Sequence, residues 1–417
     1  MVVWLRPKYA DAVIRMKHLI DPSVRVVAGC ALADLQCKSM EPYAPEVVEF
    51  LTTWSKRLFA RTDIRSYPDA ASFAYWCRPA NLAKLQRELG NDSLRLGRGL
   101  ALHIAPANVP VNFAYSFAFG LLAGNANIVR VPESLPAQAD ALCAVANELL
   151  SEAEFGRIAS MNTLISYPRD DAITQRLSAV ADVRLLWGGD QTIQHLRRMP
   201  TSPRCVDIAF ADRYSLCLMS APAVLSADSQ TLQSLSAGFY NDVFLLDQNA
   251  CSSPHLVLWQ GSEQEVDAAQ KRFWGRIQTL LLSKKELPGI HAVDKYTHLC
   301  RAAIQLEGVK VTPTSDNRVS RVFLDELPEN IAEHRGRYGF FFESIDNDLA
   351  QLSRIVNARY QTLTCFGVDA HELAQMVLAK RLPGIDRIVP VGKALDIGII
   401  WDGYDLIRTM SRIINIQ

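Results

Sequence analysis

The chain has 417 residues, of which 49% are hydrophobic and 21% are charged, a balance typical of a globular protein with more than one domain. Its 44 basic and 44 acidic residues cancel to a net charge of zero, which favours neither a nucleic acid nor an anionic membrane surface as a partner. The sequence shows no signal peptide, no apolar run near the ~20 residues of an integral membrane span, and nine cysteines without metal-ligand or disulfide spacing, which indicates a cytoplasmic protein.

Residues 1–95 mix helix-like stretches with irregular segments, and they carry no motif that predicts a function. From Gly99 the pattern becomes regular, because short apolar runs alternate with amphipathic stretches. Strands are predicted at 100–105, 128–131, 163–167, 183–187, 205–210 and 215–219, and helices from about 136 and over 171–180. This alternation predicts an α/β domain with a doubly wound parallel sheet, in which ligands bind at the C-terminal ends of the strands.

A second α/β block begins near residue 224 with a predicted helix over 232–246. The segment 247–254, which contains Cys251, separates this helix from a strand over 255–259. Further helices are predicted at 263–282, 349–358 and 370–379, and further strands at 309–311, 321–324, 340–345, 362–367 and 387–391. The sequence therefore predicts two α/β domains, with no internal repeat and no flexible linker.

Several common motifs are missing. The segment Gly97-Arg98-Gly99 lacks the third glycine of a GxGxxG dinucleotide fingerprint, and no P-loop occurs. HExxH and GxSxG are also absent, which disfavours a zinc protease and a serine hydrolase. No metal site is predicted.

Three segments remain as candidates. Asn108 follows Pro106 after a buried strand, where a side-chain amide can donate to a developing oxyanion. Gly188 and Gly189 separate a strand from a helix, where backbone N–H groups can meet a ligand. Cys251 lies among small residues between a helix and a strand, where a thiolate can face a cleft. Taken alone, each segment also fits an ordinary turn or a buried, inert cysteine.

The order of these segments resembles the aldehyde dehydrogenase superfamily, which has an asparagine between prolines, an Ala-Gly-Asn before a strand, a glycine turn and then a catalytic cysteine. Within that superfamily, residues of roughly 95–410 are similar to the acyl-CoA reductases of bacterial bioluminescence, the LuxC family. The motifs that carry the resemblance are Ile104–Pro110, Ala123–Pro132, Trp187–Ile193, Cys251–Pro254, Gly384–Gly392 and Trp401–Asp405. The resemblance implies an aldehyde dehydrogenase-like α/β fold, with a Rossmann-type cofactor domain and a second α/β catalytic domain.

The resemblance also implies roles for single residues. Cys251 corresponds to the family nucleophile, which forms a thioester with the acyl group and expels coenzyme A. Asn108 corresponds to the oxyanion-hole asparagine. NADPH, or alternatively NADH, then supplies hydride, and an aldehyde is released. Cofactor contacts are implied for Pro106, Arg130, Pro132, Trp187, Gly188 and Gly189.

The sequence departs from the superfamily at two places. Hydrolytic aldehyde dehydrogenases have a glutamate that activates water, whereas the corresponding stretch 207–212 has aspartates but no glutamate, which favours reduction over hydrolysis. Where relatives have a lysine that contacts the adenosine ribose, this chain has Arg130 or Val131, depending on the placement of a gap. A guanidinium there suits the 2′-phosphate of NADPH. Glu343 is a further candidate for a ribose contact, and His255 is interpreted as structural.

The expected domains are residues 1–223 with N-terminal helices and the cofactor site, 224–383 with the nucleophile, and 384–417, which returns to the cofactor domain. The predicted activity is NADPH-dependent reduction of an acyl-CoA, fatty acyl in the family, to an aldehyde. An acyl-phosphate reductase of the glutamyl-phosphate type and a non-catalytic acyl-binding subunit remain alternatives. The resemblance further implies a homo-oligomer and, as a partner, an acyl-protein synthetase.

Overall fold

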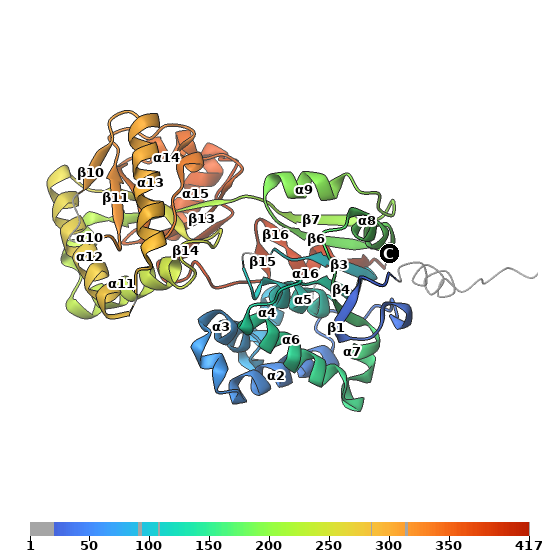
Figure 1. Cartoon of the computed structure of the whole chain (residues 1–417). Coiled ribbons are helices and arrows are strands. Elements are labelled where there is room, and N and C mark those ends of the chain that lie inside the picture. The colour runs from blue at the N-terminus through green and yellow to red at the C-terminus, as the bar shows by residue number, and fades with distance from the viewer. Residues whose placement is uncertain (1–20, 91–93, 107–108, 285, 313–315, 417) are drawn as a thin grey trace, which may run out of the picture. The chain divides into compact units, whose positions relative to one another are not determined.

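The computed structural model describes residues 21–90, 94–106, 109–284, 286–312 and 316–416 (Figure 1). The described residues up to Ala211 form one compact unit together with those from Gly398 onward. Residues Asp212–Ile397 form a second compact unit. The chain therefore leaves the first unit, builds the second and then returns.

The first unit is built on a six-stranded sheet in the order β1-β5-β4-β3-β6-β7. Its strands are β1 (Arg25–Gly29), β3 (Leu100–Ile104), β4 (Ala126–Arg130), β5 (Asn162–Ser166), β6 (Val183–Trp187) and β7 (Val206–Phe210). All neighbouring strands in this order pair in parallel except β1, which pairs antiparallel with β5. The predicted α/β class is confirmed, but the sheet is mixed and not purely parallel, because it includes the antiparallel strand β1, which is not predicted from the sequence.

A buried polar network links three strands of this sheet. His103 of β3 is fully buried, and its two ring nitrogens lie 2.8 Å from Ser116 Oγ and 2.9 Å from Asn127 Oδ1. Asn127 of β4 donates in turn to Asn162 Oδ1 of β5 at 2.7 Å. Burial lowers the pKa of His103 to about 4, so the ring is neutral at pH 7. The network therefore joins the strands without placing a charge in the core.

Helices cover both faces of the first sheet (Figure 1). The helices are α2 (Pro45–Ala60), α3 (Pro68–Trp76), α4 (Pro79–Leu89), α5 (Asn112–Leu122), α6 (Ala137–Leu150), α7 (Gly156–Ser160), α8 (Asp171–Val180) and α9 (Asp190–Arg197), with short 3-10 turns at Leu32–Asp34, Asp63–Ser66 and Ala153–Phe155. α5 and α6 lie on one face, and α8 and α9 lie on the other. α2 packs over α5 and α6, and its Trp54 ring lies 4.9 Å from Phe73 and 6.1 Å from Phe117, measured between centroids. The N-terminal helices thus form an outer aromatic layer.

The last described segment completes the first unit. β15 (Ile400–Trp401) and β16 (Tyr404–Asp405) form a hairpin, α16 (Leu406–Met410) follows, and β17 (Ser411–Ile414) pairs antiparallel with β2 (Leu94–Gly97). Asn125 Nδ2 donates to the carbonyl of Met410 at 3.0 Å, and Arg98 Nε donates to that of Thr409 at 2.6 Å. The apolar side chains of α16 are fully buried, so this segment belongs to the core of the first unit.

The second unit is built on a seven-stranded sheet in the order β10-β11-β12-β9-β8-β13-β14. Its strands are β8 (Tyr214–Ser220), β9 (Pro254–Gln260), β10 (Lys310–Thr312), β11 (Ser320–Phe323), β12 (Phe340–Ile345), β13 (Tyr360–Phe366) and β14 (Arg387–Pro390). β10 pairs antiparallel with β11, and the other neighbouring pairs are parallel. The prediction that the strand at 215–219 belongs to the first sheet is wrong, because β8 lies between β9 and β13.

The same strands account for the unit borders. The chain divides between 211 and 212 and between 397 and 398, whereas the sequence analysis places its borders between 223 and 224 and between 383 and 384. The difference arises because β8 and β14, which lie outside the predicted catalytic segment, pair within the second sheet.

The second sheet has a core on each face. Its helices are α10 (Ala221–Ser226), α11 (Ser229–Phe244), α12 (Glu263–Lys284), α13 (Gly289–Gln305), α14 (Ala350–Ile355) and α15 (Ala370–Lys380), with a 3-10 turn at Ile331–His334. Phe340 and Phe342 of β12 join a core with α14 and α15, whereas Phe341 joins a core with α11 and α12. Successive strand residues face opposite sides, so both faces are covered. Every helix in the described part of the chain is too short or too polar to serve as a membrane span.

Candidate active site

Cys251 lies in a short segment between α11 and β9. Asp247 and Gln248 both have a positive φ, of 53° and 60°, in the turn that follows α11. The buried side-chain amide of Gln248 donates to the carbonyls of Pro254 at 2.9 Å and Phe340 at 3.0 Å, and it accepts the backbone N–H groups of Gly339 and Phe340. Because both ends of this amide are fully used, the segment that carries Cys251 is anchored to β12.

Both the carbonyl and the sulfur of Cys251 take part in hydrogen bonds. Ser215 Oγ of β8 donates to the Cys251 carbonyl at 2.7 Å, and the same oxygen accepts the backbone N–H of Thr362 at 3.2 Å. Gln361 Nε2 lies 3.4 Å from Cys251 Sγ, and Gln361 Oε1 accepts from Thr362 Oγ1 at 3.2 Å. Cys251 is half-buried, whereas its three partners are buried. The four residues form a closed ring, the thiol ring, that fixes the sulfur against β8 and β13.

A half-buried cation lies on the strand next to the thiol ring. Arg387 of β14 pairs in register with Thr362 of β13, the residue that follows Gln361, and Asp396 and Asp242 act on its guanidinium more strongly than Cys251 does. The guanidinium donates to the backbone carbonyls of Lys393, Ala394 and Asp396. Burial lowers the pKa of Arg387 below its ordinary value, but an arginine remains charged at pH 7. A positive charge close to a thiol favours the thiolate.

A buried carboxylate holds the loop that Arg387 contacts. Asp242 of α11 accepts the backbone N–H groups of Gly392 at 2.6 Å and Ala394 at 2.8 Å. Its own carbonyl accepts from Ser253 Oγ at 2.6 Å, two residues after Cys251. Burial raises the pKa of Asp242 to about 7, although the two N–H groups act in the opposite direction. Asp242 therefore connects the cysteine segment to the loop after β14.

His255 and Glu343 are both enclosed in the second unit. His255 is 4% exposed and stacks on Tyr214 with ring centroids 5.6 Å apart, and burial lowers its pKa to about 3. Its burial agrees with the structural interpretation. Glu343 is 0% exposed, and it accepts the indole N–H groups of Trp259 and Trp274 at 2.9 Å each. The prediction that Glu343 contacts a ribose is wrong, because its carboxylate is used inside the core.

The aspartates of the stretch 207–212 are engaged in ion pairs. Asp207 receives the buried guanidinium of Arg184 through two bonds of 2.7 and 2.6 Å. Asp212 Oδ1 lies 3.4 Å from Arg335 Nη2. These pairs give both carboxylates a structural role.

In the first unit, the predicted cofactor residues follow neighbouring strands. Ile104 of β3 pairs in parallel with Arg130 of β4 and with Leu186 of β6, so the C-terminal ends of the three strands meet at one edge. The chain runs from β3 to β4 and β5, and it then returns to place β6 on the other side of β3. Such a reversal is where doubly wound sheets bind ligands. The residues that follow the three strands include Pro106, Pro132 and Gly188.

The end of β6 leads through two glycines into the start of α9. Trp187 stacks on Phe210 with centroids 3.7 Å apart and an interplanar angle of 16°, and its Nε1 donates to Ser116 Oγ at 3.1 Å. Gly188 N donates to the carbonyl of Phe210 at 3.2 Å. Gly189 is the N-cap of α9, and no side chain caps that helix. Because a glycine has no side chain that could cap the helix, the start of α9 resembles helix N-termini that bind anions, although Asp190 brings a carboxylate into the first turn.

Arg130 and Val131 differ in accessibility. Val131 is 0% exposed, whereas Arg130 is half-buried. The Arg130 guanidinium lies 4.8 Å from the centroid of the Tyr167 ring and donates to the Tyr167 carbonyl at 3.3 Å. Of the two alternatives, Arg130 is therefore the one that can meet a ligand at this edge. Asn108, the predicted oxyanion donor, lies outside the described residues.

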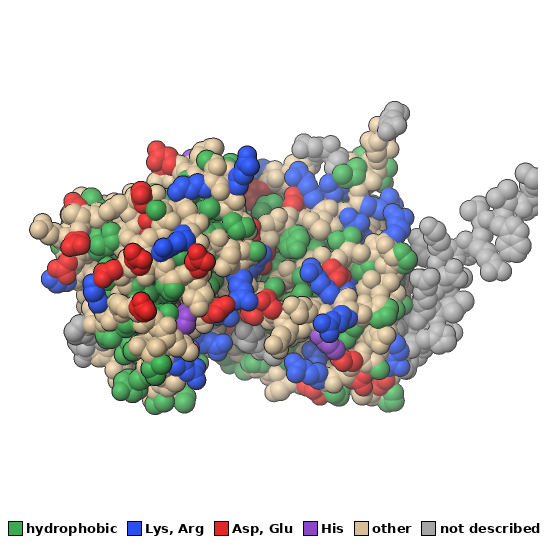
Figure 2. All heavy atoms as spheres, turned by 90° about the horizontal axis from the view of Figure 1, so that it is seen from above, with side chains coloured by type: hydrophobic (Ala, Val, Ile, Leu, Met, Phe, Trp, Pro, Cys, Tyr) green, Lys and Arg blue, Asp and Glu red, His purple; other side chains and the backbone are tan. Residues whose placement is uncertain are grey.

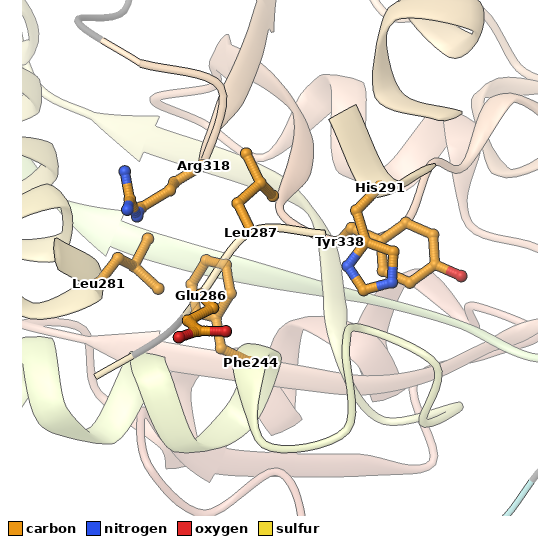
Figure 3. Close-up of a pocket in the computed structure, with 7 residues that line it drawn as sticks. All are labelled: Phe244, Leu281, Glu286, Leu287, His291, Arg318 and Tyr338. Carbon is orange, nitrogen blue, oxygen red and sulfur yellow. The ribbon is translucent and has the colours of Figure 1, made fainter. Parts of the chain in front are cut away.

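A small pocket opens in the second unit (Figure 3). Its lining residues are Phe244, Leu281, Glu286, Leu287, His291, Arg318 and Tyr338. The His291 ring stacks on Tyr338 with centroids 3.7 Å apart. None of the four residues of the thiol ring lines this pocket, so the pocket and the thiol ring are separate features of the second unit.

Charges and metal-binding groups are dispersed. Acidic and basic side chains are interspersed over the face of the molecule in Figure 2. Within the described ranges, no group of three or more His, Cys, Asp or Glu side chains could hold a metal ion.

Comparison with known proteins identifies a family. The model of the acyl-CoA reductase (LuxC) family matches residues 38–413. The long-chain acyl-protein thioester reductase of Vibrio harveyi is 26% identical over 325 residues, which are 76% of this chain and 63% of that protein. The enzyme of the same name from Aliivibrio fischeri is 30% identical over 167 residues, 39% of this chain and 32% of that protein. The matches thus span about a third to just under two thirds of these relatives.

Solved structures agree on the fold. An NAD-dependent benzaldehyde dehydrogenase from Corynebacterium glutamicum superposes with a TM-score of 0.55 at 13% identity, covering 88% of this chain and 80% of that one. An NADP-dependent enzyme from E. coli superposes with a TM-score of 0.60 at 14% identity, covering 88% and 84%. The aldehyde dehydrogenase-like fold expected from the sequence is confirmed.

Four residues around Cys251 are not predicted from the sequence, and they are Ser215, Gln248, Gln361 and Arg387. Two of them carry a signal in the sequence. Gln361 is a polar residue at the start of an apolar strand, and Arg387 lies within the motif Gly384–Gly392. Neither signal shows which residue each side chain contacts.

Proposed function

The chain belongs to the LuxC family of acyl-CoA reductases within the aldehyde dehydrogenase superfamily, and we propose that it reduces a fatty acyl-CoA to an aldehyde with NADPH, through a thioester on Cys251. The observation that carries the proposal is the setting of this thiol. Cys251 is half-buried in an anchored segment, Gln361 Nε2 lies 3.4 Å from its sulfur, and Arg387 pairs in register with Thr362, the residue that follows Gln361. A thiol beside a fixed positive charge is suited to nucleophilic attack.

The proposed reaction has two stages. The Cys251 thiolate attacks the acyl carbonyl, the bond from the acyl carbon to the coenzyme A sulfur breaks, and coenzyme A leaves as a thiolate that takes up a proton. The cofactor, when bound, supplies a hydride to the acyl carbon of the resulting thioester. The bond from that carbon to Cys251 Sγ then breaks, so the thiolate is restored and the aldehyde leaves. Asn108 and the backbone N–H of Cys251 are proposed to stabilise the carbonyl oxygen as its charge develops.

The proposed cofactor site is the sheet edge of the first unit. Pro106 and Pro132 shape the loops after β3 and β4, Trp187 forms a buried wall, and Gly188 and Gly189 leave the start of α9 open to a phosphate. The carboxylate of Asp190 in the first turn of α9 works against an anion there, so the site needs a compensating cation. Arg130 is proposed to be that cation and to favour NADPH over NADH.

The length of the acyl group and the partners rest on the relatives. Those relatives are named long-chain acyl-protein thioester reductases, which supports a long acyl chain as the substrate here. An acyl-protein synthetase partner and a homo-oligomeric state are proposed from the family resemblance, and a cytoplasmic location is proposed from the nine dispersed cysteines.

Mass spectrometry after incubation with acyl-CoAs of different chain lengths, without cofactor, tests this function. The expected result is one acyl adduct on Cys251, which is lost on addition of NADPH with release of the aldehyde. Cys251→Ala is expected to lose both the adduct and the acyl-CoA-dependent oxidation of NADPH. Cys300→Ala is the matched control, because Cys300 is also half-buried in the second unit. Full activity of Cys251→Ala contradicts the proposal.

The same experiment separates the alternatives. An adduct that forms from an acyl phosphate but not from an acyl-CoA identifies an acyl-phosphate reductase. An adduct that forms but resists both NADPH and NADH identifies an acyl-binding subunit without reductase activity.

A further inference from the structure

We propose that Gln361 is a catalytic residue, whose side-chain amide donates a hydrogen bond to the Cys251 sulfur and thereby stabilises the thiolate. This inference deepens the proposed function and rests on the role of Cys251 as the nucleophile. It assigns Gln361 to two moments of the reaction, the formation of the thiolate before it attacks and the departure of the thiolate from the reduced adduct.

The geometry supports a donor at the sulfur. Gln361 Nε2 lies 3.4 Å from Cys251 Sγ, an ordinary separation for an N–H group and a sulfur atom. Gln361 belongs to β13, a strand held between β8 and β14, and its side chain is 1% exposed. Gln361 lies where the pairing of β13 with β8 is irregular, between Tyr360 and Leu363, and its burial between two neighbouring strands limits its movement, so its contact with the sulfur is preorganised.

The orientation of the amide is set by its neighbour. Thr362 Oγ1 donates to Gln361 Oε1 at 3.2 Å, so the oxygen end of the amide is occupied and the nitrogen end faces Cys251. The backbone N–H of Thr362 donates to Ser215 Oγ, which donates to the carbonyl of Cys251. A single strand residue therefore orients the donor and also, through Ser215, the backbone of the nucleophile.

Other thiols of the same sheet show that burial disfavours the thiolate, and a donor at the sulfur opposes this effect of burial. Burial raises the pKa of Cys217 on β8 and of Cys365 on β13. A hydrogen bond donated to the charged form of an acid favours that form. The amide of Gln361 supplies such a bond and carries no charge, so its effect does not vary with pH. Arg387 of β14, which pairs in register with Thr362, carries a positive charge that favours a thiolate in the same direction.

A structural role for Gln361 leads to a different expectation. A glutamine that only fills a buried polar position would affect the stability of the second unit and leave the acidity of Cys251 unchanged. Gln361→Met keeps the approximate length of the side chain but removes the donor. Gln361→Glu keeps the shape and places a carboxylate against the sulfur, which disfavours a thiolate.

The test measures the alkylation of Cys251 by iodoacetamide between pH 5 and 10, with mass spectrometry used to follow this one of the nine cysteines. The apparent pKa of Cys251 is expected to rise by about one pH unit in Gln361→Met, which slows alkylation at pH 7 about tenfold. Gln361→Glu is expected to raise it further. Thr364→Val is the control, since Thr364 is a buried residue of the same strand that donates to the carbonyl of Leu216; its titration is expected to match that of the unmodified chain.

An unchanged titration in both Gln361 variants overturns the proposal, and so does an equal shift in Thr364→Val. The alkylation needs no acyl donor and no cofactor. The acidity of Cys251 can therefore be measured even if acyl-CoA proves not to be the substrate, and a failed acyl-CoA assay does not count against the role of Gln361.

Discussion

The carboxylate of Glu343 and the guanidinium of Arg321 form an ion pair inside the second unit, with Arg321 Nε 2.6 Å from Glu343 Oε2. Arg321 is on β11 and Glu343 is on the adjacent β12. Two tryptophan indoles also donate to Glu343, and the Arg321 guanidinium lies over one of them, Trp274, at 5.1 Å from the ring centroid. The pair therefore links two strands to α12 through one fully buried charge.

Glu343→Gln is expected to destabilise the second unit by about 3–5 kcal/mol, because it leaves the Arg321 charge buried without a counter-charge. Urea denaturation measures the change in the free energy of unfolding. The control is Asp325→Asn, since the Lys310–Asp325 pair is as short, 2.6 Å, but 61% exposed on both sides. That variant is expected to change stability by less than about 1 kcal/mol. Equal effects in the two variants would show that burial does not determine the contribution of these pairs.

Gly120→Ala is expected to disrupt the buried polar network of the first unit. A Cβ at Gly120 would lie 1.9 Å from Asn127 Oδ1 and 2.8 Å from His103 Nε2, so the hydrogen bond between these side chains has to break. The expected loss is about 1–3 kcal/mol of unfolding free energy. Gly275→Ala in α12 is the control, because its Cβ meets nothing within 4 Å. It is expected to stabilise the protein by about 0.5–1 kcal/mol. Thermal unfolding of both variants measures the two changes in stability, which are expected to have opposite signs.

Asp242 is expected to make stability depend on pH. Burial raises its pKa from 3.8 to about 7 in the folded chain, so between these values the native state holds a proton that the unfolded chain has released. The contribution of Asp242 to the free energy of unfolding therefore falls as the pH rises from about 4 to 7, and it is constant on either side of that window.

The substitution Asp242→Asn isolates this contribution. It is expected to destabilise the protein more at pH 5 than at pH 8, because at pH 8 the unmodified chain already carries the cost of a buried charge. Asp228→Asn is the control. Hydrogen bonds from Thr231 lower the pKa of Asp228, so this residue is ionised at both pH values and its substitution has the same effect at each. A larger effect of Asp242→Asn at pH 8 would contradict the assignment.

Arg130→Gln is expected to raise the KM for NADPH about tenfold, as for the loss of one hydrogen bond to a charged group, and to leave the KM for NADH unchanged. The control is Arg157→Gln, which removes a surface arginine of α7 that pairs with Glu46. Steady-state kinetics with both cofactors give the comparison. A parallel rise in both KM values would show that Arg130 does not select the 2′-phosphate.

Periodic elements could be predicted from the sequence almost to the residue. The predicted strand at 183–187 and the predicted helix at 171–180 coincide with β6 and α8. A short apolar run marks the strand, and helical spacing of apolar residues marks the helix. α13 was missed for the opposite reason. Its buried residues are Lys295 and Ala302, whereas Ile290, Val293 and Ile304 are exposed, so its apolar residues do not mark a buried face.

Long-range pairing could not be predicted. β1 pairs with β5 across more than a hundred residues, and β8 is an apolar strand whose sequence fits either sheet. The thiol ring could not be predicted from the sequence for the same reason. Cys251 was identified through the resemblance of its segment, but Gln361 contacts it from 110 residues away, and a local pattern does not reveal which distant strand residue meets a thiol.

The return of the chain to the first unit has a consequence for biosynthesis. A ribosome releases residues 212–397, which form the whole second unit, before it releases the segment that pairs β17 with β2 and buries α16. Domains fold as units while they are being made. The second unit can therefore fold on the nascent chain while the first still exposes the apolar surface that α16 will cover. Of the two units, the one whose translation begins earlier is thus the one that is completed later.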